Sequence, residues 1–184
     1  MTIGKILLTI SLMIGSILVG NASTIENSAM EIKLKAAYLY NFLRFVEWPS
    51  DSKNINVCLY GSPENYQAVF SSIPQYTQTG SEFIVKTIKL GNALGNLENC
   101  RIVFVTALAK SDTLSVLAYL NDKHSLTIGE FDSFIENGGM INFVRVEDKL
   151  RFEINNSAAE RAGLKISSKV LRIATRIHGD SNDE

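Results

Sequence analysis

The segment Lys35–Pro49 reads KAAYLYNFLRFVEWP and predicts the helix against which the rest of this 184-residue chain packs. Apolar residues recur through it at intervals of three and four, which places them along one side of an α-helix. Proline disfavours the α conformation of the residue before it, so we expect the helix to run from about Ser28 to Glu47. The residues of this apolar stripe are Ile32, Ala36, Leu39, Leu43 and Val46.

A second stripe of large aromatic side chains adjoins the first and makes the apolar sector of the helix unusually wide. It consists of Tyr38, Phe42 and Phe45, and Trp48 stands where the helix should stop. Core packing is the commoner fate of such residues, but exposed aromatics would form a protein-binding patch. We therefore take Tyr38, Phe42, Phe45 and Trp48 as candidate partner-binding residues.

Length and composition indicate one globular domain. Hydrophobic residues make up 46% of the chain and charged residues 20%, which is typical of a folded domain of this size. The 18 basic and 19 acidic side chains nearly cancel, so we expect no broad basic face and no nucleic-acid partner.

The N-terminus has the pattern of a secretory signal peptide over residues 1–22. Lys5 precedes the apolar run Ile6–Val19, and small residues stand before a predicted cleavage between Ala22 and Ser23. A retained membrane anchor is the alternative, although the run is short for a span of about 20 residues. We expect an exported protein with a polar leader over residues 23–28, one α/β domain over 23–178 and a disordered tail over 179–184.

Cys58 and Cys100 are the only two cysteines. An oxidising compartment favours a disulfide between them, and closing a loop of about 42 residues would stabilise the fold by roughly 4 kcal/mol in the chain-entropy model. Two unpaired buried thiols are the alternative. A catalytic thiol is less favoured, because neither cysteine has a histidine nearby in sequence.

Short apolar segments alternate with helical segments in the middle of the chain, which predicts an α/β fold with a mostly parallel open sheet flanked by helices. The continuous apolar run Arg101–Val105 suits a central strand that is covered on both faces. Ser111 or Asp112 should cap the helix after it. The other expected strands are 55–60, 82–90 and 125–128, and the expected helices or helical turns are 64–70, 113–120 and 130–136.

A C-terminal β-hairpin and two helices should complete the domain. Segments 140–146 and 149–154 flank a two-residue turn, which is typical of an antiparallel hairpin. Arg145 is placed to form a charge pair across it. We expect a helix over 156–162 that is capped by Asn155 and ends at Gly163. A last helix, capped by Ser168, should bury a face formed by Val170, Ile173, Ala174 and Ile177.

No motif for catalysis, cofactor binding or metal binding is evident. Gly138-Gly139 precedes a strand and suits a turn with positive φ better than a phosphate-binding loop. His124 and His178 fit no metal-ligand spacing, and no Gly-x-Ser-x-Gly is present. We expect no enzyme, although groups from distant positions could still assemble. We expect the scattered acidic side chains to lie on the solvated surface. They are Glu130, Asp132, Glu136, Glu147 and Asp148.

Five segments in order resemble the YfiR family of periplasmic proteins. They are KAAYLYNFLRFVEWP, INVCLYG, CRIVFVT, ENGGMINFV and LRFEINNSAAERAGLKISSKVLRIA, and together they extend over roughly residues 33–175. Some members have a second cysteine pair late in the chain, which this sequence lacks. Cys58 and Cys100 match the other pair, and the resemblance therefore implies a structural disulfide.

The resemblance implies a regulatory function that depends on binding. Members of the family repress a membrane-bound diguanylate cyclase through its periplasmic region and so lower cyclic di-GMP output. The resemblance also implies an outer-envelope protein that sequesters the repressor, and a homodimer. The alternative is a periplasmic small-molecule sensor with a ligand in the crevice at the strand ends, because similar domains occur attached to sensor kinases.

Overall fold

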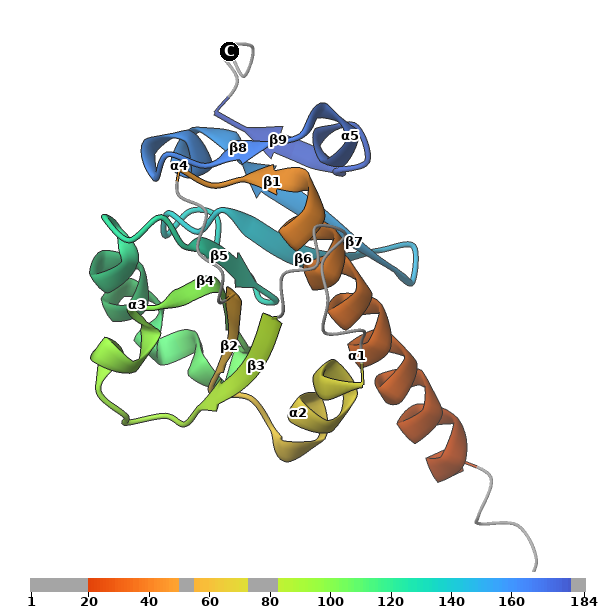
Figure 1. Cartoon of the computed structure of the whole chain (residues 1–184). Helices are drawn as coiled ribbons and strands as arrows, with labels where there is room; N and C mark the ends of the chain where they lie inside the picture. Colours follow the sequence, from red (N-terminus) through yellow and green to blue (C-terminus); the bar gives the residue numbers. More distant parts are fainter. Residues whose placement is uncertain (1–19, 50–54, 73–82, 180–184) are drawn as a thin grey trace, which may run out of the picture.

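The computed structural model describes residues 20–49, 55–72 and 83–179. The apolar run Ile6–Val19, the turn before residue 55 and the end of the tail lie outside these residues. The fold is α/β, as predicted, with a mostly parallel seven-stranded sheet in the order β3-β2-β4-β5-β6-β7-β9 (Figure 1). The strands are β2 (Ile55–Tyr60), β3 (Phe83–Ile88), β4 (Cys100–Val105), β5 (Leu126–Gly129), β6 (Ile141–Val146), β7 (Lys149–Asn155) and β9 (Arg176–His178).

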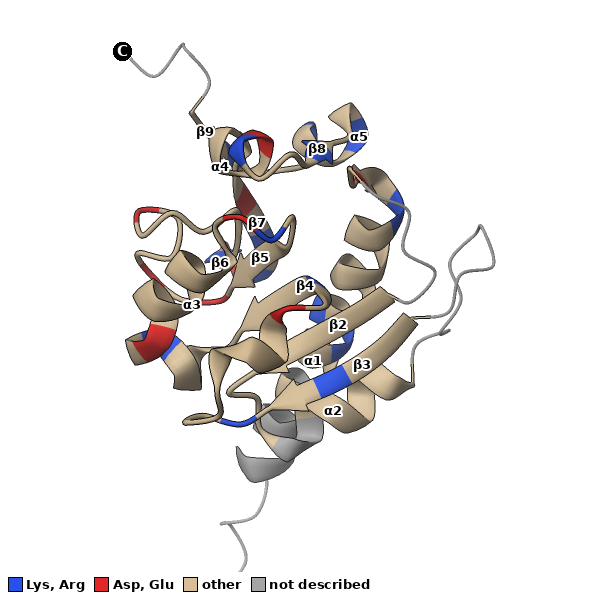
Figure 2. Ribbon diagram, turned by 60° about the vertical axis from the view of Figure 1, so that its left-hand side comes forward, with Lys and Arg blue, Asp and Glu red and all other residues tan. Residues whose placement is uncertain are grey.

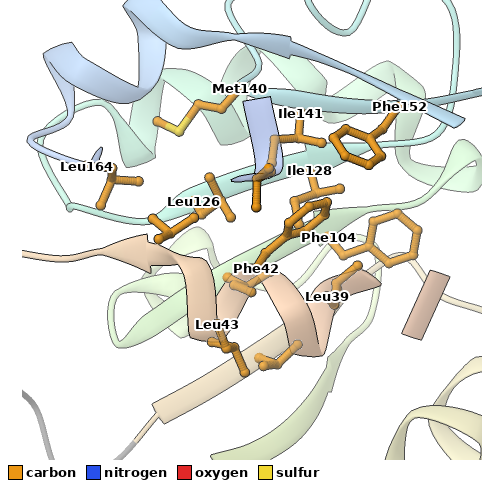
Figure 3. Close-up of a cluster of buried hydrophobic side chains, with 14 of the residues drawn as sticks. Leu39, Phe42, Leu43, Phe104, Leu126, Ile128, Met140, Ile141, Phe152 and Leu164 are labelled. Atoms are coloured by element: carbon orange, nitrogen blue, oxygen red, sulfur yellow. The ribbon is translucent and has the colours of Figure 1, made fainter. Parts of the chain in front are cut away.

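Helical segments cover both faces of the sheet. On one face the core includes side chains from α1 (Gly20–Phe45), α2 (Glu64–Ser71), α4 (Asn156–Arg161) and α5 (Ser168–Leu171). The other face is covered by α3 (Thr113–Leu120) and by two 3-10 segments, η1 (Leu94–Leu97) and η2 (Ala107–Asp112). All five members of the predicted α1 stripe are buried, which confirms that α1 packs on the sheet. Figure 3 shows Leu39 and Leu43 of α1 among the side chains of this core.

Helix α1 differs from the prediction at both ends. It begins at Gly20, so the polar leader expected over residues 23–28 is helical and the predicted cleavage site falls within α1. No glycine or proline between Asn21 and Trp48 interrupts it. The helix ends at Phe45, because Val46–Glu47 form a short strand, β1, that pairs antiparallel with β8 (Lys165–Ile166). Pairing with β8 stabilises the extended backbone that leads to Pro49.

The predicted last helix is wrong beyond its first turn. Helix α5 ends at Leu171, and its cap is Ser167, not Ser168. Residues 176–178 instead form β9, which pairs parallel with β7 and places Ile177 opposite Ile154. Ile173, expected on a buried face, is 58% exposed. The backbone N–H and C=O groups along the free side of β7 need hydrogen-bond partners. Strand β9 supplies them, whereas a longer α5 could not.

The predicted hairpin and the Asn155 cap of the helix after it are confirmed. β6 and β7 pair antiparallel across Glu147 and Asp148, both of which have positive φ. The Asn155 side chain accepts a hydrogen bond from the Ala158 amide at 3.0 Å. The cross-strand charge pair of Arg145 is wrong, because Arg145 lies opposite Leu150 and its guanidinium binds Glu31 of α1.

The predicted glycine turn and glycine helix end are confirmed, but the predicted aspartate cap is not. Gly138 and Gly163 both have positive φ, as a turn and a helix end require. A Cβ at Gly139 would overlap the ring of Phe134, so this second glycine is required for space. Asp112 stands at the N-cap position of α3, but its side chain accepts hydrogen bonds from Tyr60 and Ser111 and does not cap the helix.

The predicted disulfide joins two neighbouring central strands. Cys58 lies on β2 and Cys100 on β4, with their Cα atoms 5.8 Å apart. Asn56 lies opposite Cys100 and Val57 lies opposite Ile102, so Arg101 is an extra, bulged residue on β4. The cross-link therefore fixes β2 to β4 next to an irregularity in their pairing.

Replacing both cysteines by alanine should lower the free energy of unfolding by about 2–5 kcal/mol, because the unfolded chain regains the entropy of an open loop. Urea unfolding of the oxidised wild type, the reduced wild type and the Cys58→Ala/Cys100→Ala variant would measure it. Reduced wild type and variant should unfold at similar urea concentrations. An oxidised protein with the same midpoint as the reduced one would show that the disulfide contributes nothing.

Candidate functional site

A buried ion-pair cluster fixes α1 at the carboxyl edge of the parallel strands. Lys35 of α1 is only 6% exposed, and its Nζ lies 2.7 Å from Glu130 Oε2 and 2.6 Å from Glu31 Oε1. Glu31 also binds Arg145 at the end of β6. The expectation that Glu130 is solvated surface is wrong, because its side chain is as buried as that of Lys35.

Glu130 connects three further elements around this lysine. It directly follows β5, and its carboxylate accepts hydrogen bonds from the Tyr66 hydroxyl of α2 at 3.1 Å and from the Ala107 amide at the start of η2 at 2.9 Å. Burial lowers the pKa of Lys35, but the adjacent Glu130 carboxylate outweighs it and holds this pKa above its usual value. Burial and the charge of Glu130 raise the pKa of Tyr66 to about 12.

The strand ends at which a ligand-sensing α/β protein would bind its ligand hold several contacts within the chain. The strand order reverses direction at β2 and β4, where open α/β sheets commonly bind ligands. Here the Thr106 hydroxyl donates to the Gly61 carbonyl at 2.8 Å, and a Cβ on Gly61 would collide with Ala109. Glu130 occupies the adjoining strand end. These contacts pack Gly61, Thr106 and Ala109 closely together at the strand ends.

The four candidate partner-binding aromatics separate into two groups. Phe42 is 1% exposed and lies in the core, and Tyr38 packs against Phe42, Phe143 and Phe152 at ring-centroid distances of 5.3–6.1 Å. Phe45 and Trp48 are half-buried and lie where α1 ends. Tyr38, Phe45 and Trp48 are all half-buried at the edge of the core, and of these Phe45 and Trp48 lie where α1 ends.

Cationic side chains surround these two rings. The Arg44 guanidinium lies 5.3 Å and the Lys169 Nζ 5.9 Å from the Phe45 ring centre, and the Arg101 guanidinium lies 5.1 Å from that of Trp48. Such distances are within range of cation–π attraction. In Figure 2 basic residues mark β8 and α5, the elements next to the end of α1. We call this group of Arg44, Phe45, Trp48, Arg101 and Lys169 the α1-end surface.

Two donors of the α1-end surface have no hydrogen-bond partner within the described residues. They are Arg44 Nε and Trp48 Nε1, and both atoms are buried. Buried polar atoms are usually satisfied, so unpaired donors at an edge of the core indicate a place where water or a partner supplies the acceptor.

Sequence reasoning missed Arg101, Lys169 and the role of Glu130. A β-bulge brings Arg101 to Trp48, and a bulge has no signal in a single sequence. Lys35 offered a weak signal, because it adjoins the apolar stripe of α1 and a lysine there requires a buried acid.

The two histidines are held by local partners. His124 Nδ1 lies 2.7 Å from the Ala162 carbonyl, and His178 Nε2 lies 3.0 Å from Glu153 Oε2. Across the described ranges, no group of three or more His, Cys, Asp or Glu could hold a metal ion. None of the helices in the described part of the chain has the length and hydropathy needed to cross a bilayer.

Comparison with protein families identifies the domain. The DUF4154 model, described as YfiR/HmsC-like, matches residues 32–175, from the buried stripe of α1 to the start of β9. The chain belongs to the YfiR/HmsC-like family. This family is known for periplasmic regulators of signalling rather than for enzymes.

A solved structure shows a similar fold at low sequence identity. A conserved domain protein from Vibrio cholerae O1 biovar El Tor matches with a TM-score of 0.56 and 16% identity, over 79% of this chain and 60% of that chain. The ABC domain from Streptococcus pneumonia in complex with L-Trp matches with a TM-score of 0.46 and 13% identity, over 67% and 54%. This chain thus spans less than two thirds of either structure. Comparison with curated proteins finds no match.

Removing the positive charge of the buried cluster should destabilise the fold strongly. Lys35→Met leaves the buried Glu130 carboxylate without its cation, whereas Glu31 keeps Arg145, and we expect a loss of about 3–5 kcal/mol in the free energy of unfolding. Lys165→Met is the matched control, because Lys165 and Glu47 form an exposed pair at 3.5 Å and should contribute less than about 1 kcal/mol. Equal effects of both variants in urea unfolding would contradict a buried structural pair.

The cluster should also make the protein sensitive to alkaline pH. The pKa values of Lys35 and Tyr66 are raised in the folded state, so the folded protein holds these protons more tightly. Their stabilisation is complete below the pKa values of the unfolded chain, about 10, and falls as the pH rises above them; the contribution of Tyr66 is lost as the pH approaches its folded pKa of about 12. Thermal unfolding between pH 9 and 12 should show a shallower decline for Tyr66→Phe than for wild type, whereas Tyr119→Phe should follow wild type.

Proposed function

We propose that this protein is an exported regulatory binding protein that represses a membrane-bound diguanylate cyclase through the cyclase's periplasmic region. The family match over residues 32–175 supports this most strongly, because it includes nearly all of the domain. Repression keeps cytoplasmic cyclic di-GMP low, and release of the repressor raises it. An outer-envelope protein that sequesters the repressor, and a homodimer, belong to the same proposal.

Repression of this kind requires the repressor to bind the two states of the cyclase with different affinities, and it requires no catalysed reaction. A binding protein shifts a cyclase toward its inactive state only by the difference between its affinities for the two states. A tenfold difference corresponds to about 1.4 kcal/mol, so a few side chains are sufficient. The proposed mechanism is therefore a docking contact that the inactive form of the cyclase satisfies better than the active form.

The α1-end surface is our candidate for this contact. Half-buried aromatic rings flanked by arginine are the residue types that dominate binding energies at protein interfaces. Phe45 and Trp48 supply the rings, and Arg44, Arg101 and Lys169 supply positive charge beside them. A complementary patch on the cyclase would present carboxylates or carbonyls beside an apolar side chain. From the predicted docking set we choose the two aromatics at the helix end, Phe45 and Trp48.

The function is tested by measuring cyclic di-GMP in the native cell with the gene deleted and then restored. Deletion should raise cyclic di-GMP, and the complete gene should reverse the rise. A gene that lacks the codons for Ile6–Val19 should not reverse it, because the protein would stay in the cytoplasm. An unchanged level after deletion would overturn the repressor proposal.

Variants of the α1-end surface should separate docking from folding. We expect Phe45→Ala and Lys169→Glu each to weaken repression, with an affinity loss of about tenfold or more for an aromatic hot spot. Lys169 is exposed, so its charge reversal should leave the unfolding midpoint unchanged. The matched control is Lys149→Glu on the exposed β6–β7 turn. If Lys149→Glu weakens repression as much as Lys169→Glu, the contact does not lie at the end of α1.

A further inference from the structure

A small cavity opens between α3 and α4, away from the ion-pair cluster and the α1-end surface. Its volume is about 50 Å³. Five apolar residues from α3, α4 and the start of β6 form most of its wall: Leu117, Leu120, Met140, Ala158 and Ala162. For comparison, an apolar cavity of about 150 Å³ holds a benzene molecule, so this one accommodates only a few heavy atoms.

The wall of this cavity includes a buried threonine hydroxyl whose hydrogen has no acceptor among the described residues. Thr127 of β5 is 2% exposed, and its Oγ1 accepts a hydrogen bond from the Met140 amide at 3.2 Å. Its hydroxyl hydrogen meets no acceptor within the described residues. A hydroxyl carries one donor besides its acceptor sites, and leaving a buried donor unpaired is unfavourable. An acceptor atom placed in the cavity would pair this hydrogen.

An exposed arginine also lines this cavity. Arg161, the last residue of α4, makes no side-chain hydrogen bond or ion pair with any described residue. The neighbouring acid Glu160 is occupied with the Asn156 amide at 2.9 Å. Asn121, also in the lining, donates to Asp122 at 3.4 Å, and no carboxylate lines the cavity.

We propose that this cavity binds a small carboxylate of about the size of acetate or propionate. One carboxylate oxygen accepts the hydroxyl hydrogen of Thr127, and the negative charge lies near the Arg161 guanidinium. The short alkyl end packs on Leu117 and Met140. The carboxylate would pair with the Thr127 hydroxyl and the Arg161 charge, and the alkyl end would contact the apolar wall. The small volume of the cavity limits the ligand to a few heavy atoms. The site does not depend on the repressor function.

The test uses the full mature chain, labelled with ¹⁵N and titrated with sodium propionate or sodium acetate against sodium chloride of equal ionic strength. We expect saturable amide shifts in β5, α3 and α4 with the carboxylates and none with chloride. Thr127→Val removes the hydroxyl and Arg161→Gln removes the charge. Each should weaken binding by about tenfold or more, because each removes a charge-assisted contact.

Two further variants separate loss of the site from loss of the fold. Thr127→Ser keeps the hydroxyl and should keep binding near the wild-type level. Arg172→Gln removes an exposed arginine after α5 and should change nothing. Non-saturable shifts, or equal affinity in wild type, Thr127→Val and Arg161→Gln, would overturn the proposal and assign the cavity to water alone.

Discussion

Burial of α1 on the sheet is the packing interaction on which the rest of the molecule depends. The stripe from Ile32 to Val46 supplies one side of the larger core, and strands β2, β4, β5, β6 and β7 supply the other. Burying a leucine-sized side chain stabilises a fold by about 1.5–3 kcal/mol, so the stripe contributes several such increments. Because α1 extends along the strands, it also places the ion-pair cluster at one edge of the sheet and the α1-end surface at the other.

The charged cluster fixes where α1 lies along the strands. An apolar stripe alone tolerates sliding by a turn, because neighbouring turns present similar side chains to the sheet. Lys35 removes this freedom, since its ammonium must meet Glu130 or remain buried without a counter-charge. Tyr66 and the Ala107 amide hold the same carboxylate and thereby fix α2 and η2 as well. Burying these charges is unfavourable because they lose their hydration, but their pairing allows only one arrangement of α1, α2, η2 and the end of β5.

Much of this architecture could be predicted from the sequence, and the failures share a physical cause. The α1 stripe, the central strands and the hairpin follow from local periodicity and spacing, and the Cys58–Cys100 disulfide follows from the export signal and the presence of just two cysteines. The β1–β8 pair and β9 could not be predicted, because short edge strands form where distant backbone groups need partners. Glu130 looked like any surface acid, since its burial depends on Lys35, 95 residues away. The α1-end surface was found in part: its aromatics have a helical signal, but its cations come from a bulge and from α5.

The cavity and the α1-end surface are joined by a short, continuous piece of structure. Helix α4, which lines the cavity, leads through Gly163 into β8, and β8 pairs with β1 directly before Trp48. A Cβ on Gly163 would lie 3.1 Å from Pro49, so the end of α4 and the end of α1 are already in close contact. Contact alone is not coupling. A carboxylate in the cavity would alter docking at Phe45 and Trp48 only if α4 has two positions that the ligand and the partner bind with different affinities. The two sites should then affect each other's affinity equally, so measuring propionate affinity with and without the docked partner would detect that coupling from either side.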